Sequence, residues 1–442
     1  VMQRILCFFT ALLLGMFSVS GAHAELVIEI TRGLNDAVPI AVVPFGAQGT
    51  APSLDIADVV ANDLALSERF APMSRRDMID KPSSGDQIQF ADWRLLKTSY
   101  ILVGKSINTS PDHFDVQFEL FNVLNGQNLL RMHIAANTAN MRMAAHQISD
   151  IVFRQLTGIP GVASTRIAYV NVEGDPPNQI FKLTVSDADG ANAYVAVPSK
   201  DPIMSPAWSP DGSSIAYVSF ANKAAAIYVV FLRTGEIRRV SARAGINGAP
   251  AWSPDGKQLA LTLSRKDGDV DVYTLELATQ MLTRMTYDPA IDTEPAWSPD
   301  GTKLYFTSDR SGSPQVYETD LNDVHHTPRR ITFEGNYNAR PRVSPDGKQL
   351  AVVHQDGGSF NIAVFDLKSG VLQVLTKGTQ DESPSYAPNG AQLIFATRKG
   401  GLGMLALVTT DGRSADNRSM ETRSATSGDV REPVWGPLPA KQ

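Results

Sequence analysis

A short motif that returns six times along the chain restricts its fold more than any other feature of the sequence. Its most regular form is Pro-Ala-Trp-Ser-Pro-Asp-Gly, and its copies begin 43 to 49 residues apart. The five full copies occupy residues 206–212, 250–256, 295–301, 341–347 and 384–390, and a truncated sixth copy occupies residues 433–437. A period of this length is typical of one four-stranded blade of a β-propeller.

The two ends of the repeat array complement each other. Each full copy leads into an apolar strand, at residues 215–218, 259–262, 304–307, 350–353 and 393–396. A sixth such strand, residues 167–170, has no motif before it, whereas the last motif, around Trp435, has no strand after it. We therefore expect six blades, with the C-terminal segment as the inner strand of the blade that starts near Ile167. This arrangement closes the ring and leaves no open sheet edge.

The residue types of the motif point to a structural role. Proline, then aspartate or asparagine, then glycine is a sequence that forms a tight hairpin between two strands. The tryptophans at the same position, Trp208, Trp252, Trp297 and Trp435, are expected to pack between blades.

The region before the repeats has a different pattern. Between residues 25 and 160, strands are expected at 26–30, 40–44, 100–104 and 114–120, and helices at 56–69 and 141–156. This alternation predicts a mixed α/β domain. Residues 158–161, Gly-Ile-Pro-Gly, form the natural linker to an all-β six-bladed propeller at 161–442.

The first 24 residues have the parts of a secretory signal. Arg4 precedes an apolar run at residues 5–19, and the small residues at 20–24 predict cleavage between Ala24 and Glu25. The single cysteine, Cys7, lies within this segment, so the exported chain is expected to contain no disulfide, cysteine nucleophile or thiolate metal site. No later stretch is apolar enough to span a membrane, so no stable membrane insertion is expected.

Composition and motifs exclude several classes of function. The chain has 40 basic and 46 acidic residues and no basic block, so nucleic acid is not an expected partner. Nucleophile-elbow, zinc-protease, P-loop and dinucleotide-binding motifs are absent from the sequence. We therefore expect a protein that binds other proteins, with no catalytic residue, cofactor or metal site.

The residues just before each inner strand vary from blade to blade, while the turns hardly change. They are 203–204, 248–249, 292–294, 338–340, 381–383 and 431–432. In a propeller such connectors converge at one mouth of the central channel, on the face opposite the turns. This mouth is the expected binding surface.

Several stretches together resemble the TolB family, the periplasmic components of Tol-Pal systems. The most specific ones are residues 39–45, 165–170, 204–212, 247–250 and 293–295, together with the C-terminal Pro-Val-Trp-Gly-Pro at 433–437. The resemblance covers essentially the whole exported chain. It implies a periplasmic location and a role in constricting the outer membrane at division and in preserving its integrity.

The resemblance also implies partners. The peptidoglycan-associated lipoprotein Pal would bind the propeller mouth, through Met204, Ile246, Ala249, Asp292, Thr293, Glu294, Arg340, Asp381 and Glu382. The C-terminal domain of TolA would bind the extreme N-terminal segment, Glu25, Leu26, Val27, Ile28, Glu29, Ile30, Thr31, Arg32 and Gly33. TolQ and TolR would belong to the same system. Because Leu26, Ile28 and Ile30 alternate, this segment suits either docking on its own domain or adding a strand to a partner.

Two other classes of function remain as alternatives. A metal-dependent propeller hydrolase would need acidic and amide ligands around the channel, which Asp292, Glu294, Asn338 and Asp381 could supply. A glycan-binding propeller would need tryptophans outside the repeat positions, and Trp93 is the only one.

Overall fold

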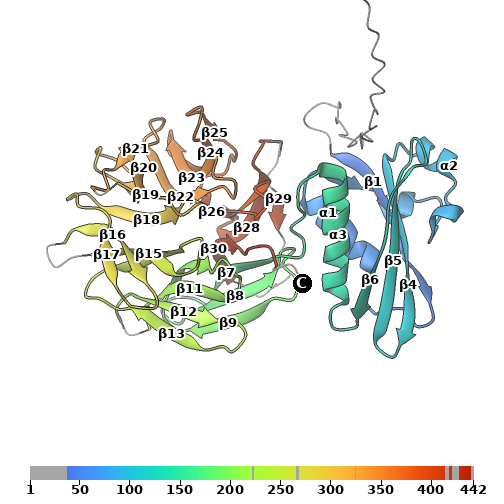
Figure 1. Ribbon diagram of the computed structural model, residues 1–442, viewed down its shortest axis with the longest axis horizontal. Coiled ribbons are helices and arrows are strands. Elements are labelled where there is room, and N and C mark those ends of the chain that lie inside the picture. The colour runs from blue at the N-terminus through green and yellow to red at the C-terminus, as the bar shows by residue number, and fades with distance from the viewer. Residues whose placement is uncertain are drawn as a thin grey trace, which may run out of the picture. The chain divides into compact units, whose positions relative to one another are not determined.

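The computed structural model describes residues 37–439, except 222, 265–267, 324, 414–417 and 421–427. An α/β domain occupies Val38–Thr157, and six four-stranded sheets follow it (Figure 1). The expected strand at 26–30 and the expected signal segment lie outside the described residues. Among the described residues, no helix combines the length and the apolar character needed to cross a bilayer.

The α/β domain is built on one mixed sheet. Its strands are β1 (Val38–Val42), β2 (Gly46–Gln48), β3 (Phe70–Pro72), β4 (Tyr100–Ser110), β5 (His113–Asn122) and β6 (Asn128–Asn137), in the order β3-β1-β4-β5-β6 with β2 on β4. Strand β1 pairs in parallel with β3 and β4, and β4, β5 and β6 form an antiparallel meander.

Three helices complete this domain: α1 (Ile56–Leu66), α2 (Phe90–Leu95) and α3 (Met141–Thr157). Helix α1 begins at a capping aspartate, Asp55, whose side chain accepts from the backbone N–H of Asp58. Helix α3 ends at Gly158, whose left-handed backbone (φ 78°) directs its N–H to the carbonyl of Arg154. The sequence expectations for both helices and for β1, β4 and β5 are therefore met in their main parts.

The differences from the expected elements have local causes. The helix expected to reach Arg69 ends at Leu66, because the following residues form β3 and pair with β1. Strand β6 was not expected, since it lies at the sheet edge and most of its side chains are at least partly exposed, which weakens the alternation. Helix α2, with six residues, is too short to give a periodic signal.

The propeller has six antiparallel blades, each given from its inner strand outward. They are β10 (Ile203–Trp208), β11 (Ser214–Ser219), β12 (Ala226–Phe231), β13 (Ile237–Ser241); β14 (Asn247–Trp252), β15 (Gln258–Ser264), β16 (Val270–Glu276), β17 (Leu282–Arg284); β18 (Asp292–Trp297), β19 (Lys303–Ser308), β20 (Gln315–Asp320), β21 (Arg329–Arg330); β22 (Tyr337–Val343), β23 (Gln349–Asp356), β24 (Ser359–Asp366), β25 (Leu372–Val374); β26 (Glu382–Tyr386), β27 (Gln392–Lys399), β28 (Leu402–Thr409), β29 (Arg418–Met420); and β30 (Gly428–Trp435), β7 (Arg166–Glu173), β8 (Ile180–Asp187), β9 (Tyr194–Ser199).

The last of these sheets, which we call the closing blade, confirms the expected ring closure. The C-terminal strand β30 is its inner strand and pairs antiparallel with β7, so that Trp435 lies opposite Ile167. Each other blade is continuous in sequence, so the ring is joined covalently everywhere except at this pairing.

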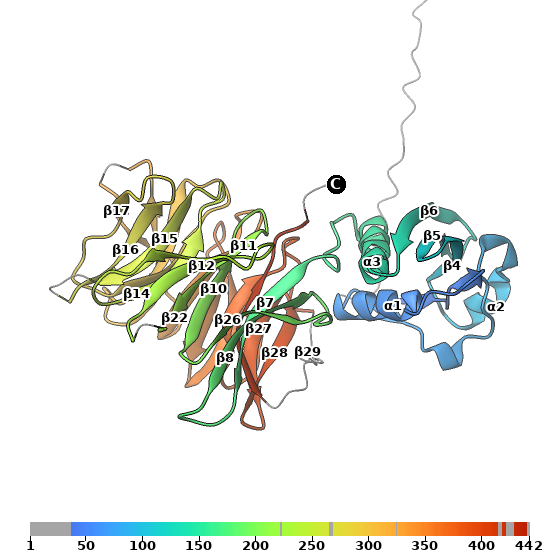
Figure 2. The ribbon, with the colours of Figure 1, turned by 90° about the horizontal axis from the view of Figure 1, so that it is seen from below.

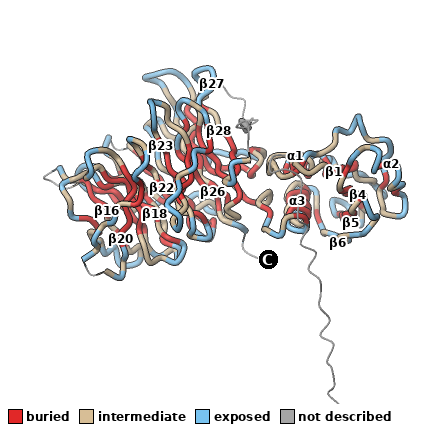
Figure 3. Tube along the Cα trace, turned by 90° about the horizontal axis from the view of Figure 1, so that it is seen from above, coloured by how far each residue is buried: buried red, intermediate tan, exposed pale blue. Residues whose placement is uncertain are grey.

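The repeated tryptophans pack between blades, as expected. Each of three indoles donates to a backbone carbonyl of the preceding inner strand: Trp208 to Val434, Trp252 to Ala207 and Trp297 to Ala251, all at 3.1 Å. Trp435 instead donates to the hydroxyl of Thr165 at 2.8 Å. The buried residues are concentrated in the strands of the blades, where these contacts lie (Figure 3).

The Ser-Pro-Asp-Gly turns satisfy their own polar groups. In the third of them, the Ser298 hydroxyl donates to Asp300 at 2.5 Å and accepts the N–H of Lys303 at 2.9 Å. Asp300 also accepts the N–H of Thr302, and these hydrogen bonds, led by the one from Ser298, lower the pKa of its carboxyl to about 2. Gly301 has a φ of 71°, which glycine adopts without strain.

Candidate functional site

The propeller has one face at which all six inner strands begin, and we call it the mouth face. Inner strands of neighbouring blades lie beside one another around the channel (Figure 2). The residues expected to be connectors at this face are mostly part of the strands themselves, since β10, β14, β18 and β22 already begin at Ile203, Asn247, Asp292 and Tyr337. The variable residues are therefore held by sheet hydrogen bonds, not by loops.

Every inner strand contains one residue in the left-handed region, directly before a proline. These six residues have φ values from 45° to 56°: Ser205, Ala249, Glu294, Arg340, Ser383 and Glu432. Each lies where the pairing with the next strand shifts register, as expected of a β-bulge. A residue before proline ordinarily stays extended, so this backbone is strained. Bulges of this kind redirect side chains, and all six of these residues line the central channel.

The channel is lined by charges that pair across blades. Arg340 donates from Nε to Oε1 of Glu294 at 2.8 Å and also contacts the Ser383 hydroxyl. Burial alone would lower the pKa of Arg340, but the charges of Glu294 and other nearby carboxylates raise it. Glu432 accepts the backbone N–H of Ser205, and burial raises the pKa of its carboxyl. The chamber on the turn side of these residues has a volume of about 430 Å³.

Buried polar side chains anchor the loops that lead into four inner strands. Each lies two residues before the left-handed residue: Asn247, Asp292, Asn338 and Asp381. Asn247 and Asn338 donate to the carbonyls of Arg243 and Glu334, both at 2.7 Å. Asp381 accepts the N–H of Gly378 at 3.1 Å.

Asp292 has a charged partner instead of a loop amide. Its carboxylate is fully buried and pairs with Arg310 at 2.7 Å, and burial raises its pKa. Asp292 and Asp381 were expected to contact a partner, yet both are 0% exposed. These two buried side chains help to shape the mouth face and are not exposed on its surface.

The other expected contact residues differ in exposure. Met204, Ile246 and Glu382 are exposed, whereas Ala249, Glu294 and Arg340 are partly exposed in the channel wall. The hydroxyl of Thr293 lies 3.2 Å from that of Thr262 in the neighbouring blade.

Three large apolar side chains on the same face were not predicted. Tyr287 and Ile291 lie in the loop between β17 and β18, and Phe333 lies in the loop between β21 and β22. Tyr287 is 63% exposed and Phe333 is 69% exposed, and the guanidinium groups of Arg284 and Arg330 lie within 5 Å of the respective ring centroids. The signal in the sequence is a large apolar residue in a loop that leads directly into an inner strand.

A cleft of about 420 Å³ opens on the mouth face beside the channel. Its lining includes the aromatic rings of Tyr337 and Phe360, and the charged side chains of Glu382, Arg398 and Arg431. The mouth face therefore combines exposed apolar groups with charges of both signs.

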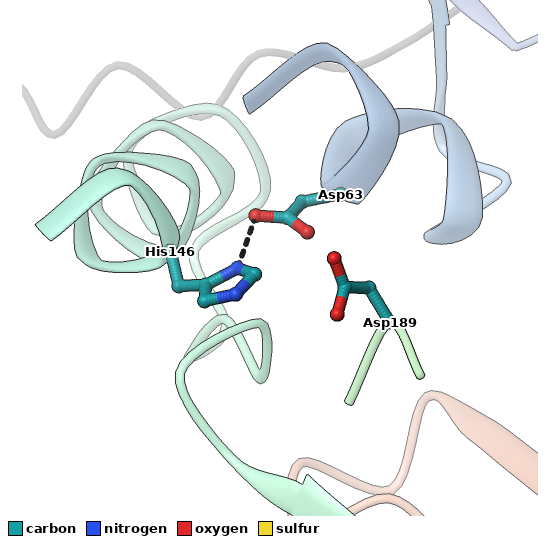
Figure 4. A group of neighbouring side chains, drawn as sticks. All are labelled: Asp63, His146 and Asp189. Atoms are coloured by element: carbon teal, nitrogen blue, oxygen red, sulfur yellow. Dashed lines mark hydrogen bonds and ion pairs between the residues drawn. The ribbon is translucent and has the colours of Figure 1, made fainter. Parts of the chain in front are cut away.

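The described residues do not gather the four suggested metal ligands into a metal site. Asp292 is paired with Arg310, and Asn338 is hydrogen-bonded to Gln315 and to Glu334. In the part of the chain that the structure describes, the one group with metal-ligating geometry is Asp63, His146 and Asp189, away from the mouth face (Figure 4). Trp93, suggested as a glycan platform, is 1% exposed in the core of the α/β domain.

The residues expected to bind TolA, Glu25 to Gly33, and the expected cleavage site at Ala24 and Glu25 lie outside the described residues. The structure therefore adds nothing to these two predictions.

Comparison with known proteins covers nearly the whole chain. The model of the TolB amino-terminal domain matches residues 26–129, and that of the TolB beta propeller domain matches residues 153–439. The chain is 43% identical over 438 residues to the Tol-Pal system protein TolB of Xanthomonas campestris pv. campestris, with 98% of each chain covered. It is 46% identical over 429 residues to that of Nitrosococcus oceani, with 97% of each covered.

A solved structure agrees with these relatives. The crystal structure of TolB from Acinetobacter baumannii superimposes with a TM-score of 0.83 and 39% sequence identity, covering 91% of this chain and 97% of that one. An α/β domain, a closed six-bladed propeller and these full-length matches lead to one assignment. The chain belongs to the TolB family of Tol-Pal system proteins.

Proposed function

We propose that this protein works in the periplasm and binds the lipoprotein Pal at the mouth face of its propeller and the C-terminal domain of TolA through Glu25–Gly33. In this role it supports invagination of the outer membrane at division and the integrity of that membrane. The observation that carries the Pal assignment is the set of exposed apolar side chains around an ion-paired channel mouth: Met204, Ile246, Tyr287, Ile291 and Phe333.

The composition of this surface suits a protein partner. Methionine, aromatic residues and arginine are enriched at protein interfaces, and apolar side chains gathered on one exposed face mark interaction sites. Arg398 and Arg431, with Glu382, supply polar groups next to them.

The mouth face is also pre-organised. The loop before β14 is fixed by Asn247 and the loop before β22 by Asn338, so little conformational entropy remains to be lost when a partner binds. We therefore expect rigid docking of the partner on the propeller.

The test is calorimetric titration with the cognate Pal. Thr293→Arg and Ala249→Trp place bulky side chains at the mouth, and each should weaken binding by about 100-fold or more, because a clash at the centre of an interface is not relieved by the rim. Thr279→Arg is the matched control, since Thr279 is exposed in the hairpin after β16, on the face opposite the mouth. No binding by the unaltered protein would refute the proposal, and so would equal loss in all three variants.

The TolA assignment has its own test. Deleting residues 25–33 should abolish binding to the TolA C-terminal domain. If one segment either docks on its own domain or pairs with a partner, the same deletion should also change the affinity for Pal. Unchanged Pal affinity would reject that coupling and leave the Pal site itself untouched.

A further inference from the structure

A buried cluster of charges joins the α/β domain to the closing blade. Asp63 comes from α1, Arg142 and His146 come from α3, and Asp187 and Asp189 come from the end of β8 and the turn that follows it. The two domains belong to one compact unit, and side chains from both meet here (Figure 4).

His146 lies between carboxylates of the two domains. Its ring is 0% exposed, and Nδ1 lies 2.8 Å from Oδ2 of Asp63, an oxygen that also accepts the Ser149 hydroxyl at 2.7 Å. The other ring nitrogen, Nε2, lies 3.7 Å from Oδ2 of Asp187 in the propeller. A neutral imidazole carries a proton on one nitrogen only, whereas an imidazolium is charged and protonated on both nitrogens. It can therefore hydrogen-bond to Asp63 and form an ion pair with Asp187 at the same time.

The charges of the cluster require a second cation. The cluster holds three carboxylates, Asp63, Asp187 and Asp189, and one guanidinium, that of Arg142, which contacts Asp189 and lies 3.5 Å from Asp187. Buried carboxylates that lack a cationic partner are strongly destabilising. A proton on His146 supplies that partner from within the cluster.

We propose that His146 is protonated in the folded protein and acts as a cationic bridge that locks the α/β domain onto the closing blade. This role is independent of any partner at the mouth face. The three residues with metal-ligating geometry do not need an ion, because Asp189 already contacts Arg142 and Asp63 is already paired with His146.

Other contacts also join the two domains. Leu66 and Val162 pack against the apolar cluster that contains Trp435, and the Gln392 side chain donates to the carbonyl of Leu66 at 2.8 Å. One further ion pair joins Arg69 to Asp411 at 2.9 Å. Asp150 of α3 also accepts the backbone N–H groups of Ala163 at 2.7 Å and Ser164 at 3.1 Å, just after the linking segment. Asn389 of the propeller donates to the carbonyl of Pro160 at 2.8 Å. Because these contacts hold the link between the domains, we expect loss of the bridge to widen the range of domain orientations without separating the domains.

The bridge predicts a pH dependence with a defined sign. Burial alone would lower the pKa of His146, but the nearby carboxylates of Asp187 and Asp63 raise it from 6.5 to about 10. The stabilisation is therefore complete below pH 6.5 and is lost as the pH rises through about 10. The other charged groups around the ring are Asp63, Arg142, Asp187 and Asp189, and burial raises the pKa of the Asp63 carboxyl, while its hydrogen bond with His146 lowers it.

The direct test is ¹⁵N NMR of the histidine ring in the intact exported protein. At pH 8 both ring nitrogens of His146 should carry protons, and assignment follows from loss of the signal in His146→Gln. A single protonated nitrogen at pH 8 would overturn the proposal. So would a stoichiometric metal ion whose removal by a chelator changes the His146 signal.

The mechanical consequence is tested by the distance between spin labels at Leu124→Cys and Val371→Cys, one exposed position in each domain. Because the only native cysteine is Cys7, in the expected signal, these labels are unambiguous. His146→Gln should broaden the distance distribution at pH 7. The matched control His133→Gln removes an exposed histidine paired with Asp115 inside one sheet and should leave the distribution narrow. Equal widths in both variants would refute the bridge as a lock.

Discussion

The two ends of the propeller's inner strands satisfy their polar groups in different ways. At the turn end, polar groups are satisfied within a few residues, as in the Ser298–Asp300 pair, and the solution repeats in blade after blade. At the mouth end, the chain adopts a strained bulge, and side chains reach across blades, as Arg340 does to Glu294. Hydrogen bonds within one turn can recur unchanged in every blade. Contacts between blades depend on the side chains of the neighbouring blade and therefore differ from one blade to the next.

This difference explains why the mouth can vary without loss of the fold. The ring is held by the tryptophans near the turn end and by the strand pairing of β30 with β7. The mouth end is free to carry different side chains in each blade, provided that each loop remains anchored. The following predictions test this division from the largest expected effect to the smallest.

Ring closure should be the most sensitive part of the turn-end scaffold. Trp435→Ala should lower the free energy of unfolding by about 3–5 kcal/mol, because it removes a buried aromatic side chain from the one blade that is closed without covalent continuity. Urea unfolding measures the change. Trp297→Ala removes the same residue from a continuous blade, where the indole is only half-buried, and should cost less; an equal cost would contradict the special role of closure.

The mouth-end anchors should matter for stability, not only for binding. Asp292→Ala leaves Arg310 without its buried partner and should cost about 3 kcal/mol in the free energy of unfolding. Asp288→Ala is the control, since Asp288 is 3.9 Å from the same arginine but partly exposed, and its loss should cost less than about 1 kcal/mol. A small effect of Asp292→Ala would show that its pair with Arg310 does not stabilise the mouth face.

A glycine should relieve the backbone strain at the mouth. Ala249 has a φ of 45°, so Ala249→Gly should raise the free energy of unfolding by about 1 kcal/mol. Ala251→Gly, two residues later in the same strand but without positive φ, should lower it by about 0.5–1 kcal/mol. Thermal unfolding of the two variants measures both changes in stability. Changes of the same sign would argue against backbone strain at Ala249.

Acid should remove part of the stabilisation at the turn end of the blades. The depressed pKa of Asp300, about 2, means that its stabilisation is present above pH 4 and is lost as the pH falls through 2. The melting temperature of Asp300→Ala should therefore lie slightly below that of the unaltered protein at pH 7, and the gap should narrow toward pH 2. Asn389, the equivalent residue of the fifth blade, does not titrate, so the gap for Asn389→Ala should not follow this acid transition.

The mouth residues show the limits of inference from the repeats. Alignment of the copies separated the variable positions from the constant turns, but it treated Asp292 and Thr293 alike. In the structure Asp292 is buried against Arg310, while Thr293 is partly exposed. The missed residues Tyr287 and Phe333 lie in the loops before the repeat motif, where no alignment of the motif extends.

The sequence by itself determined the number of blades, the closure of the ring and the geometry of the turns. These features depend on contacts between residues close together in the chain, or on a motif that is missing at one end and present at the other. Only the tertiary structure decided which mouth residues are buried, where the backbone is strained, and that His146 faces both Asp63 and Asp187. Those properties depend on groups that the closed ring and the domain contact bring together. The spacing of these residues in the sequence does not predict such contacts.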